Sequence, residues 1–352
     1  MKRTFFAIAI VGTMAFTACQ KDLSGDRLVD EAVMTVKVND ALSKALGVTA
    51  ANESTINNYD VFVFNASTGV IDGYKSESSS ASLSLTSTSG AKHVYVVANR
   101  QSGFDVTGVR SEANFLAKTA SLLKETSNSF IMIGEKDCTL SSSQTNTVEV
   151  DVTRFVAKIA LTSLAVNFSG TPLAGQSLEN VRIYLKNVPA EKLFSGNDVT
   201  SPTLLSGNSS AWKTGALNAG LLYDEVASIA DGSSTNNHNY YPYSRWSTTA
   251  MSAAGCIRLV ITADIDGNND GTPENYTWSI PVNGSGSDVV QGEAVHYGVK
   301  ANHTYSIAAT ITRLGTLSSE PDAENTDIDY AQNTVTISVD PWITDLSSTV
   351  TF

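Results

Sequence analysis

The chain has 352 residues, of which 42% are hydrophobic and only 16% are charged. This hydrophobic content excludes an intrinsically disordered chain, and the length suits about two domains. The formal net charge of -12 leaves no basic stripe to neutralise phosphates, which argues against nucleic acid as a partner.

The first residues carry the pattern of an export signal. Lys2 and Arg3 give a positive start, an apolar run follows at 5–16, and small residues precede Cys19. The run is too short for a permanent membrane span, so residues 1–18 are predicted to be a cleaved signal peptide. Small residues before a cysteine indicate the lipoprotein variant, in which Cys19 is acylated and becomes the first mature residue. The alternative is an ordinary secretory signal with a chance cysteine, and in both cases the mature chain leaves the cytosol.

Most of the mature chain alternates between apolar and polar residues, which predicts strands with one buried face. Two runs, 59–64 and 94–98, are apolar on both faces and are predicted to be central strands. The alternating runs lie at 34–38, 148–152, 181–185, 259–263, 305–311 and 335–339.

One segment has helical spacing of its apolar residues, 111–124, with Ser111 as the expected N-cap. Long polar loops are predicted at 76–82, 195–211 and 318–326. Because strands and helices do not alternate regularly, a doubly wound sheet is excluded and two β-sandwiches are favoured, one at 34–153 and one from 154 to the C-terminus.

Cys138 and Cys256 are far apart in the sequence. In an oxidising compartment they either form a disulfide or stay as buried free thiols, and we favour free thiols.

An aromatic cluster lies between the predicted sandwich strands of the second half. It has two interpretations: rings that stack on a glycan, or rings that fill the core, and we favour the core. Its members are His238, Tyr240, Tyr241, Tyr243, Arg245 and Trp246.

The segment 264–271 is the one candidate ion site. Oxygen-bearing side chains at Asp266, Asn268 and Asp270, followed by Gly271, match the first half of a calcium loop. The bidentate acid expected at the end of such a loop is missing, because Thr277 stands there. A plain hairpin turn requires similar residues, so we favour a turn and expect no cofactor, with calcium as the alternative.

Catalysis finds little support in the sequence. The four histidines are scattered, and no zinc-protease motif, nucleophile elbow, paired-cysteine motif or glycine-rich phosphate loop occurs. We therefore expect a protein that is not an enzyme.

Six segments, in the same order and over nearly the whole mature chain, resemble the Bacteroidales fimbrillins, the FimA-like subunits of surface fimbriae. Each alone is a strand with a turn residue, and together with the lipoprotein signal they make a specific match. They are the segments 59–64, 94–99, 130–134, 154–159, 301–307 and 339–342.

The resemblance implies an all-β chain with minor helix, folded as two transthyretin-like Greek-key sandwiches at 45–153 and 154–352. It also implies a lipoprotein that is held in the outer membrane through lipid on Cys19. An arginine-specific protease then removes the N-terminal segment 19–44, which includes the first strand. The C-terminal strands of a neighbouring subunit then fill the groove. In such strand addition, main-chain hydrogen bonds give affinity and alternate side chains give specificity. When the contact is repeated head-to-tail from subunit to subunit, it produces a filament.

The two ends of the chain fit this scheme unevenly. At the C-terminus, 334–339 alternates, Pro341 interrupts it, and 347–352 follows as a second piece. The alternative is that these are ordinary last strands of the second sandwich. The expected donor residues are Val335, Ile337, Val339, Trp342, Val350 and Phe352.

At the N-terminus, alignment places the cut between Lys44 and Ala45, where the family usually has arginine. The arginine upstream, Arg27, precedes the strand predicted at 34–39, so cutting there would free the lipid but leave the groove filled. The leading hypothesis is a polymerising and adhesive fimbrial subunit whose partners are copies of itself or related subunits. The missing arginine motivates a second hypothesis, an uncleaved anchor or accessory pilin. A third is a stand-alone surface lipoprotein that binds glycans or host proteins.

Overall fold

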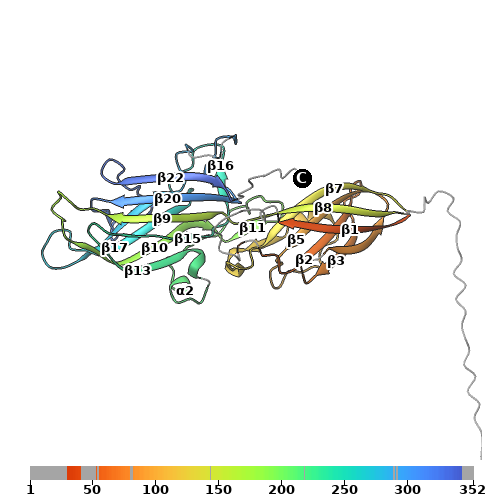
Figure 1. Cartoon of the computed structure of the whole chain (residues 1–352), viewed down its shortest axis with the longest axis horizontal. Coiled ribbons are helices and arrows are strands. Elements are labelled where there is room, and N and C mark those ends of the chain that lie inside the picture. The colour runs from red at the N-terminus through yellow and green to blue at the C-terminus, as the bar shows by residue number, and fades with distance from the viewer. Residues whose placement is uncertain are drawn as a thin grey trace, which may run out of the picture.

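The computed structural model describes residues 30–40, 53, 55–79, 82–142, 144–217, 219–287, 290 and 292–342. Two β-rich bodies lie end to end along the long axis of the molecule, the earlier strands at one end and the later strands at the other (Figure 1). The nearly all-β fold expected from the alternating pattern is confirmed. Strand β8 of the first body ends at Arg154 and β9 of the second begins at Lys158, while the domain limits given above stay a prediction.

The first body is a sandwich of two layers. Its strands are β1 (Glu31–Asp40), β2 (Tyr59–Asn65), β3 (Ile71–Glu77), β4 (Leu83–Thr88), β5 (Gly90–Ala98), β7 (Met132–Leu140) and β8 (Thr145–Arg154). The hydrogen-bonded order is β3-β2-β5-β7-β8-β1-β4. The layers β3-β2-β5-β7 and β8-β1-β4 enclose one core between them.

Strands β2 and β5 are buried on both faces, as their doubly apolar sequences predicted. Alternate side chains of β2, such as Val61 and Val63, enter the core of the sandwich. Phe62 and Phe64 point the other way and pack on Phe115, with ring centroids 4.9 and 5.7 Å away. A sheet covered on both sides needs no polar face, which explains the continuous apolar runs.

The two layers join where β7 and β8 pair at residues 132–133 and 153–154. Beyond Gly134 the two strands diverge into separate layers. A Cβ atom at Gly134 would lie 2.2 Å from the carbonyl oxygen of Asp151, so only glycine allows this close crossing.

The predicted helix over 111–124 is only partly correct. Helix α1 (Glu112–Leu116) begins where expected, and the Ser111 side chain accepts a hydrogen bond from the backbone N–H of Asn114 (3.2 Å). The chain then forms β6 (Thr119–Ser121) and a single 3-10 turn (Leu122–Lys124). Strand β6 pairs with a strand of the second body, so a tertiary ladder overrides the helical spacing of the leucines.

The second body also has two main sheets. One has the order β12-β10-β17-β18-β21 with β13 on β10, and the other has the order β14-β9-β20-β22 with β15 on β9. Their apolar faces enclose a core that continues to the outer face of β2 and β5. The strands are β9 (Lys158–Val166), β10 (Ser177–Pro189), β11 (Glu191–Leu193), β12 (Leu204–Ser206), β13 (Tyr223–Ala230), β14 (Ser234–Thr235), β15 (His238–Tyr240), β16 (Arg245–Ser247), β17 (Arg258–Ile265), β18 (Glu274–Pro281), β19 (Tyr297–Val299), β20 (His303–Ile311), β21 (Thr316–Leu317) and β22 (Thr334–Pro341).

The strands predicted from alternation are all present, as β1, β8, β10, β17, β20 and β22. Segments predicted as loops contain short elements that the sequence analysis missed. Strand β12 and the start of helix α2 (Ser210–Lys213) fall within 195–211, and a 3-10 turn (Ala323–Asn325) falls within 318–326. A further 3-10 turn spans Ala219–Leu221.

The aromatic cluster is mostly core, as favoured. Tyr240, Tyr241 and Tyr243 are buried, whereas Trp246 is 43% exposed. Cys138 and Cys256 are both free thiols, as favoured, but only Cys256 is buried and Cys138 is half-buried. Within the part of the chain that the structure describes, no helix has the length and apolarity needed to cross a membrane.

Candidate assembly site

Strand β1 occupies the middle of its layer. It pairs antiparallel with β4 along 31–36 and parallel with β8 along 33–40. Both main-chain edges of β1 are therefore used. If β1 were absent, β4 and β8 would each present an unpaired edge, and the space between them would be one strand wide.

The inward side chains of β1 belong to the core of the first sandwich. Ala32, Met34 and Val36 are at most 1% exposed, and Val38 is half-buried. On the outer face, Lys37 is exposed and forms a surface ion pair with Glu149 (3.5 Å). The place of β1 is thus a slot with an apolar floor, two hydrogen-bonding walls and an open outer side.

Processing residues proposed from the sequence lie beyond the ends of β1. Cys19, Arg27, Lys44 and Ala45 all fall outside the described residues. In sequence, Arg27 precedes the start of β1 at Glu31, whereas Lys44 follows its end at Asp40. Only a cut at the later position would separate β1 from the rest of the chain.

Strand β22 has a different environment. Among the described residues it is the last strand of its sheet and pairs along one edge only, antiparallel to β20. Val335 and Ile337 are half-buried and Val339 is 9% exposed, while the side chains between them face solvent. The structure therefore places three of the six expected donor residues on one inward face; Val350 and Phe352 lie outside the described residues.

A pocket of about 590 Å³ that opens to solvent lies beside β22. Val335 and Ile337 form part of its wall, together with Cys256, Arg258 and Tyr330. The inward face of β22 therefore borders an open pocket, whereas the inward face of β1 lies in the closed core of its sandwich.

The remaining expected donor residue, Trp342, lies between the two bodies. Its ring stacks on Tyr241 (centroids 5.8 Å apart), meets Phe130 of the first body edge-on (6.1 Å), and lies 4.6 Å from the guanidinium carbon of Arg154. Its backbone N–H donates to the Asn302 carbonyl (2.9 Å). Trp342 thus anchors the end of β22 at the junction.

Two buried carboxylates at the same junction carried no signal in the sequence. The Glu53 carboxylate accepts hydrogen bonds from the Tyr241 hydroxyl (2.5 Å) and from Lys158 Nζ (2.9 Å). The backbone carbonyl of Glu53 accepts a hydrogen bond from Arg154 Nε (2.8 Å). Glu125 is 2% exposed and accepts from the Tyr243 hydroxyl. Both acids come from irregular segments, whose partners only the tertiary fold can supply.

The loop after β17 is held by its own hydrogen bonds. The Asp266 carboxylate accepts from the backbone N–H groups of Asp270 (3.0 Å) and Gly271 (2.8 Å). The Asn268 side chain donates to Asp270 Oδ2 (3.0 Å) and to Glu274 Oε1 (2.8 Å). These bonds are those of a polar turn. Among the described residues no group of three or more His, Cys, Asp or Glu side chains is arranged to hold a metal ion, and the calcium alternative stays an untested prediction.

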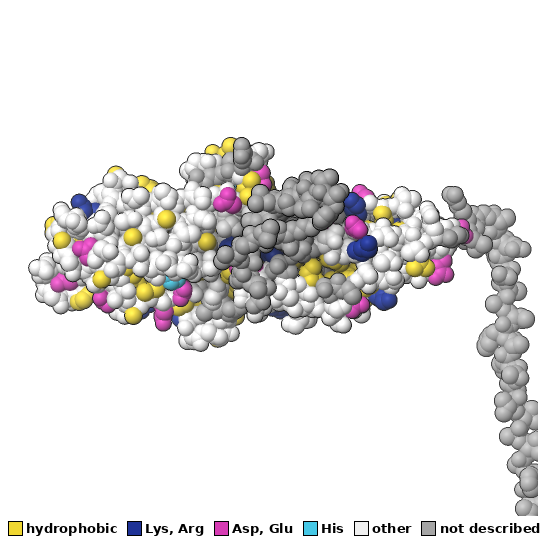
Figure 2. Space-filling view, viewed as in Figure 1, with side chains coloured by type: hydrophobic (Ala, Val, Ile, Leu, Met, Phe, Trp, Pro, Cys, Tyr) yellow, Lys and Arg dark blue, Asp and Glu magenta, His cyan; other side chains and the backbone are white. Residues whose placement is uncertain are grey.

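The charged side chains on the face shown in Figure 2 lie singly or in small groups of mixed sign among uncharged ones, and hydrophobic side chains appear there in separate groups. No basic stripe crosses this face. This distribution agrees with the low charge content of the chain.

Comparisons with known proteins point to one group. The family model described as major fimbrial subunit protein (FimA) matches residues 32–174. No curated protein matches the sequence.

Three solved structures have the same fold over most of their length. A "putative cell adhesion protein" from Bacteroides eggerthii is 22% identical with a TM-score of 0.65, and covers 89% of this chain and 96% of its own. Another protein with that description, from Parabacteroides distasonis, is 17% identical with a TM-score of 0.65, and the match covers 90% of this chain and 98% of that protein. A fimbrilin (fimA) from Porphyromonas gingivalis is 19% identical with a TM-score of 0.61, covering 89% and 98%. The resemblance to the Bacteroidales fimbrillins that the sequence indicated is confirmed.

Proposed function

We propose that this chain, which resembles the fimbrillins in sequence and fold, is a structural and adhesive subunit of surface fimbriae. Its polymerisation would begin when proteolysis removes β1, and it would proceed when β22 and the residues after it leave their own sandwich. The freed segment of one copy then fills the slot of β1 in the next copy. Because the slot and the strand lie on different parts of the surface, the contact repeats head-to-tail and builds a filament.

The observation that carries this proposal is the unequal packing of the two strands. The slot of β1 offers main-chain partners on both edges and a close-packed apolar floor. Among the described residues, strand β22 has a partner on one edge and lies beside an open pocket. A strand that moved from the second environment to the first would gain a second ladder and a better-packed inner face.

The size of this gain can be estimated for the side chains. Full burial of a Val or Ile side chain is worth about 1.5–3 kcal/mol relative to exposure, so completing the burial of a half-buried one gains about 1 kcal/mol. Val335 and Ile337 are in that half-buried state. The added ladder contributes further, at about 0.5–1.5 kcal/mol per hydrogen bond. These gains favour the polymer over the closed subunit once the slot is empty.

Export and anchoring complete the proposal. Acylation of Cys19 would hold the precursor in the outer membrane, and a cut between Lys44 and Ala45 would release the lipid and β1 together. The end of β1 at Asp40 supports the later cut rather than one at Arg27, because only the later cut lies beyond the strand.

The proposal is tested by deleting residues 334–352 from the full-length chain in its native host. We expect the folded precursor to reach the surface while fimbriae are lost, because the donor is gone. A matched deletion within the polar turn 268–270 should leave fimbriae intact. Long fimbriae in cells whose sole subunit lacks 334–352 would overturn strand donation.

A second function, an uncleaved anchor or accessory pilin, is favoured by one observation. Position 44 is lysine, whereas the family usually has arginine at the cut. The N-terminal residue of protein sheared from cells separates the two functions. A start at Ala45 supports the polymerising subunit, and an intact acylated Cys19 supports the anchor. A monomer that binds a glycan would instead favour the stand-alone lipoprotein.

A further inference from the structure

Strand β4 depends on β1 for its main-chain ladder, since β4 pairs with no other strand among the described residues. Removal of β1 would leave β4 attached to the sandwich by side chains and by its short connection to β5. An incoming strand can pair along both edges of the slot only if β4 keeps its place while the slot is empty. Whatever holds β4 in the absence of β1 therefore controls assembly.

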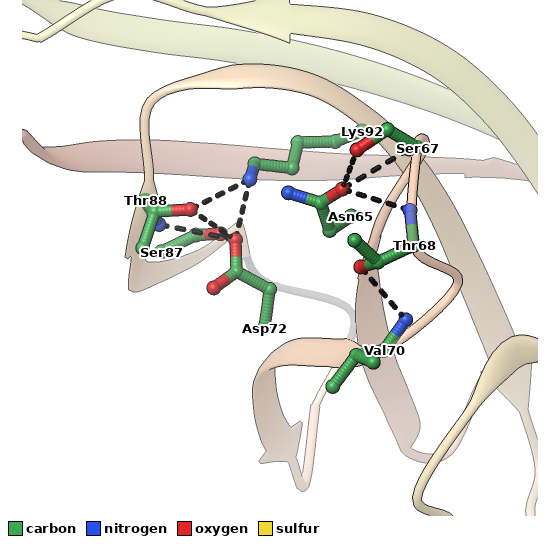
Figure 3. Close-up of polar contacts among 8 residues, drawn as sticks. All are labelled: Asn65, Ser67, Thr68, Val70, Asp72, Ser87, Thr88 and Lys92. Carbon is green, nitrogen blue, oxygen red and sulfur yellow. Dashed lines mark hydrogen bonds and ion pairs between the residues drawn. The ribbon is translucent and has the colours of Figure 1, made fainter. Parts of the chain in front are cut away.

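A buried polar cluster ties β4 to β3 and β5 (Figure 3). Lys92 of β5 has no exposed surface and donates to Asp72 Oδ2 (2.5 Å) and to Thr88 Oγ1 (2.7 Å). The same Asp72 oxygen accepts from Thr88 Oγ1 (2.6 Å), from the Thr88 backbone N–H (3.2 Å) and from Ser87 Oγ (2.9 Å). Residues of three strands thus converge on one carboxylate oxygen.

Other contacts hold β3 and β4 side by side although no ladder joins them. Lys75 Nζ of β3 donates to the Ser84 carbonyl of β4 (2.7 Å). A Cβ atom at Gly73 would lie 3.1 Å from the Thr86 carbonyl oxygen, so glycine lets the two backbones approach this closely. None of these contacts involves β1, and all of them would survive its removal.

Asp72 is in the charged form that its ion pair with Lys92 requires. Burial acts to raise its pKa, but the hydrogen bonds from Lys92, Thr88 and Ser87 prevail and lower it below its ordinary value. The carboxylate is therefore charged at neutral pH, and it pairs with a fully buried Lys92 while its own side chain is 17% exposed. A buried pair of this kind is costly to break, because the remaining partner would be an uncompensated charge.

We propose that Asp72, Lys92 and Thr88 form a clamp that holds β4 as a preformed wall of the slot, so that a strand from a second copy of this chain can pair with it. The inference rests on the proposed strand exchange. The three residues are positioning residues: they act on the incoming strand through β4. The partner is defined by its chemistry, an extended segment with apolar residues at every second position.

The test uses the full-length chain with one specific protease site placed at residue 44. The protein is folded with β1 in place and then cut. Fluorescent peptides with the sequences of residues 30–41 and 334–352 are offered, and their uptake is followed by anisotropy. Uncut samples of each variant are melted in parallel, to report stability alone.

The clamp variant is Asp72→Asn/Lys92→Met, which removes both charges together and leaves no unpaired ion in the interior. The matched control is Asp60→Asn/Arg100→Met, which removes a partly buried pair (2.8 Å) that does not touch β4. Thr88→Val removes one hydroxyl from the clamp and serves as a milder variant.

We expect the two double variants to lower the melting temperature of uncut protein similarly. After cutting, the clamp variant should take up either peptide at least tenfold more weakly than the control, and Thr88→Val should be intermediate. Equal uptake by clamp and control variants would overturn the clamp. If the cut wild-type protein binds the peptide 30–41 but not the peptide 334–352, strand exchange is overturned. The comparison of clamp and control variants with the peptide 30–41 still tests the clamp in that case.

Discussion

The hydroxyl of Tyr243 donates a 2.7 Å hydrogen bond to the carboxylate of Glu125, across the junction between the two bodies. Both side chains are buried, and Gln101 Nε2 (2.8 Å) and the Ile131 backbone N–H (3.0 Å) also donate to this carboxylate. Burial raises the pKa of Glu125 to about 7, and the three hydrogen bonds oppose only part of that rise. The junction therefore contains an acid that titrates near neutral pH.

This acid makes stability depend on pH. The ordinary pKa of 4.5 applies to the unfolded chain, so the stabilisation from protonated Glu125 is fully present below pH 4.5 and is lost as pH rises through 7. The shift corresponds to about 3 kcal/mol. We expect the unfolding free energy of Glu125→Gln, relative to wild type, to rise by about that amount between pH 4 and pH 8 in urea titrations. A constant difference over this range would show that Glu125 does not titrate as described.

Met34 is predicted to matter for the precursor and not for the polymer. Met34→Ala empties a fully buried site in β1 and should lower the stability of the uncut chain by about 2–5 kcal/mol. Since β1 is absent from the proposed mature subunit, fimbriae assembled from the variant should melt like wild type. Lys37→Ala, on the exposed face of β1, is the control and should change neither value. Reduced polymer stability in Met34→Ala would place β1 in the mature fibre.

Ile337 is predicted to behave in the opposite way. In the closed subunit it is half-buried beside an open pocket, so Ile337→Ala should cost about 1–2 kcal/mol in thermal or urea unfolding. In the polymer the same side chain would be fully buried, and the loss should be larger, about 2–5 kcal/mol. Thr336→Ala, which points to solvent, controls for changes in strand propensity. Equal losses in monomer and fibre would argue against transfer of this strand.

Trp342 is predicted to stabilise the junction through its ring. Trp342→Ala removes the stacking on Tyr241 and the contact with Arg154, at a cost of about 2 kcal/mol in urea unfolding. Trp342→Phe retains a ring and should recover part of the loss. Indistinguishable stabilities for the two variants would mean that the stacking contributes nothing.

The loop at Asp266 is predicted to need its carboxylate and no metal. Asp266→Ala removes the acceptor of the Gly271 N–H and one of the two acceptors of the Asp270 N–H, and should cost about 0.5–1.5 kcal/mol. Asp266→Asn should cost less, because it keeps one acceptor oxygen. Melting of wild type with calcium or with a chelator should give the same midpoint. A rise of several degrees with calcium would favour the calcium loop instead.

The sequence alone was sufficient for the strands with clear alternation, because a period of two follows directly from the geometry of a half-buried strand. The runs at 181–185 and 305–311 became β10 and β20 for that reason, and the doubly apolar run at 59–64 became a strand covered on both faces. Local chemistry was also enough for the cap at Ser111. These features depend on neighbours within a few residues.

Tertiary structure decided the features that depend on distant partners. The leucines after residue 117 have helical spacing, but pairing of β6 with β11 makes their segment a strand and a turn. Nothing local shows that β1 would lie between β4 and β8, or that Lys92 and Asp72 would meet beside Thr88. A strand's pattern reports which face is buried, whereas its place in a sheet is set by the competition among all the strands for main-chain partners.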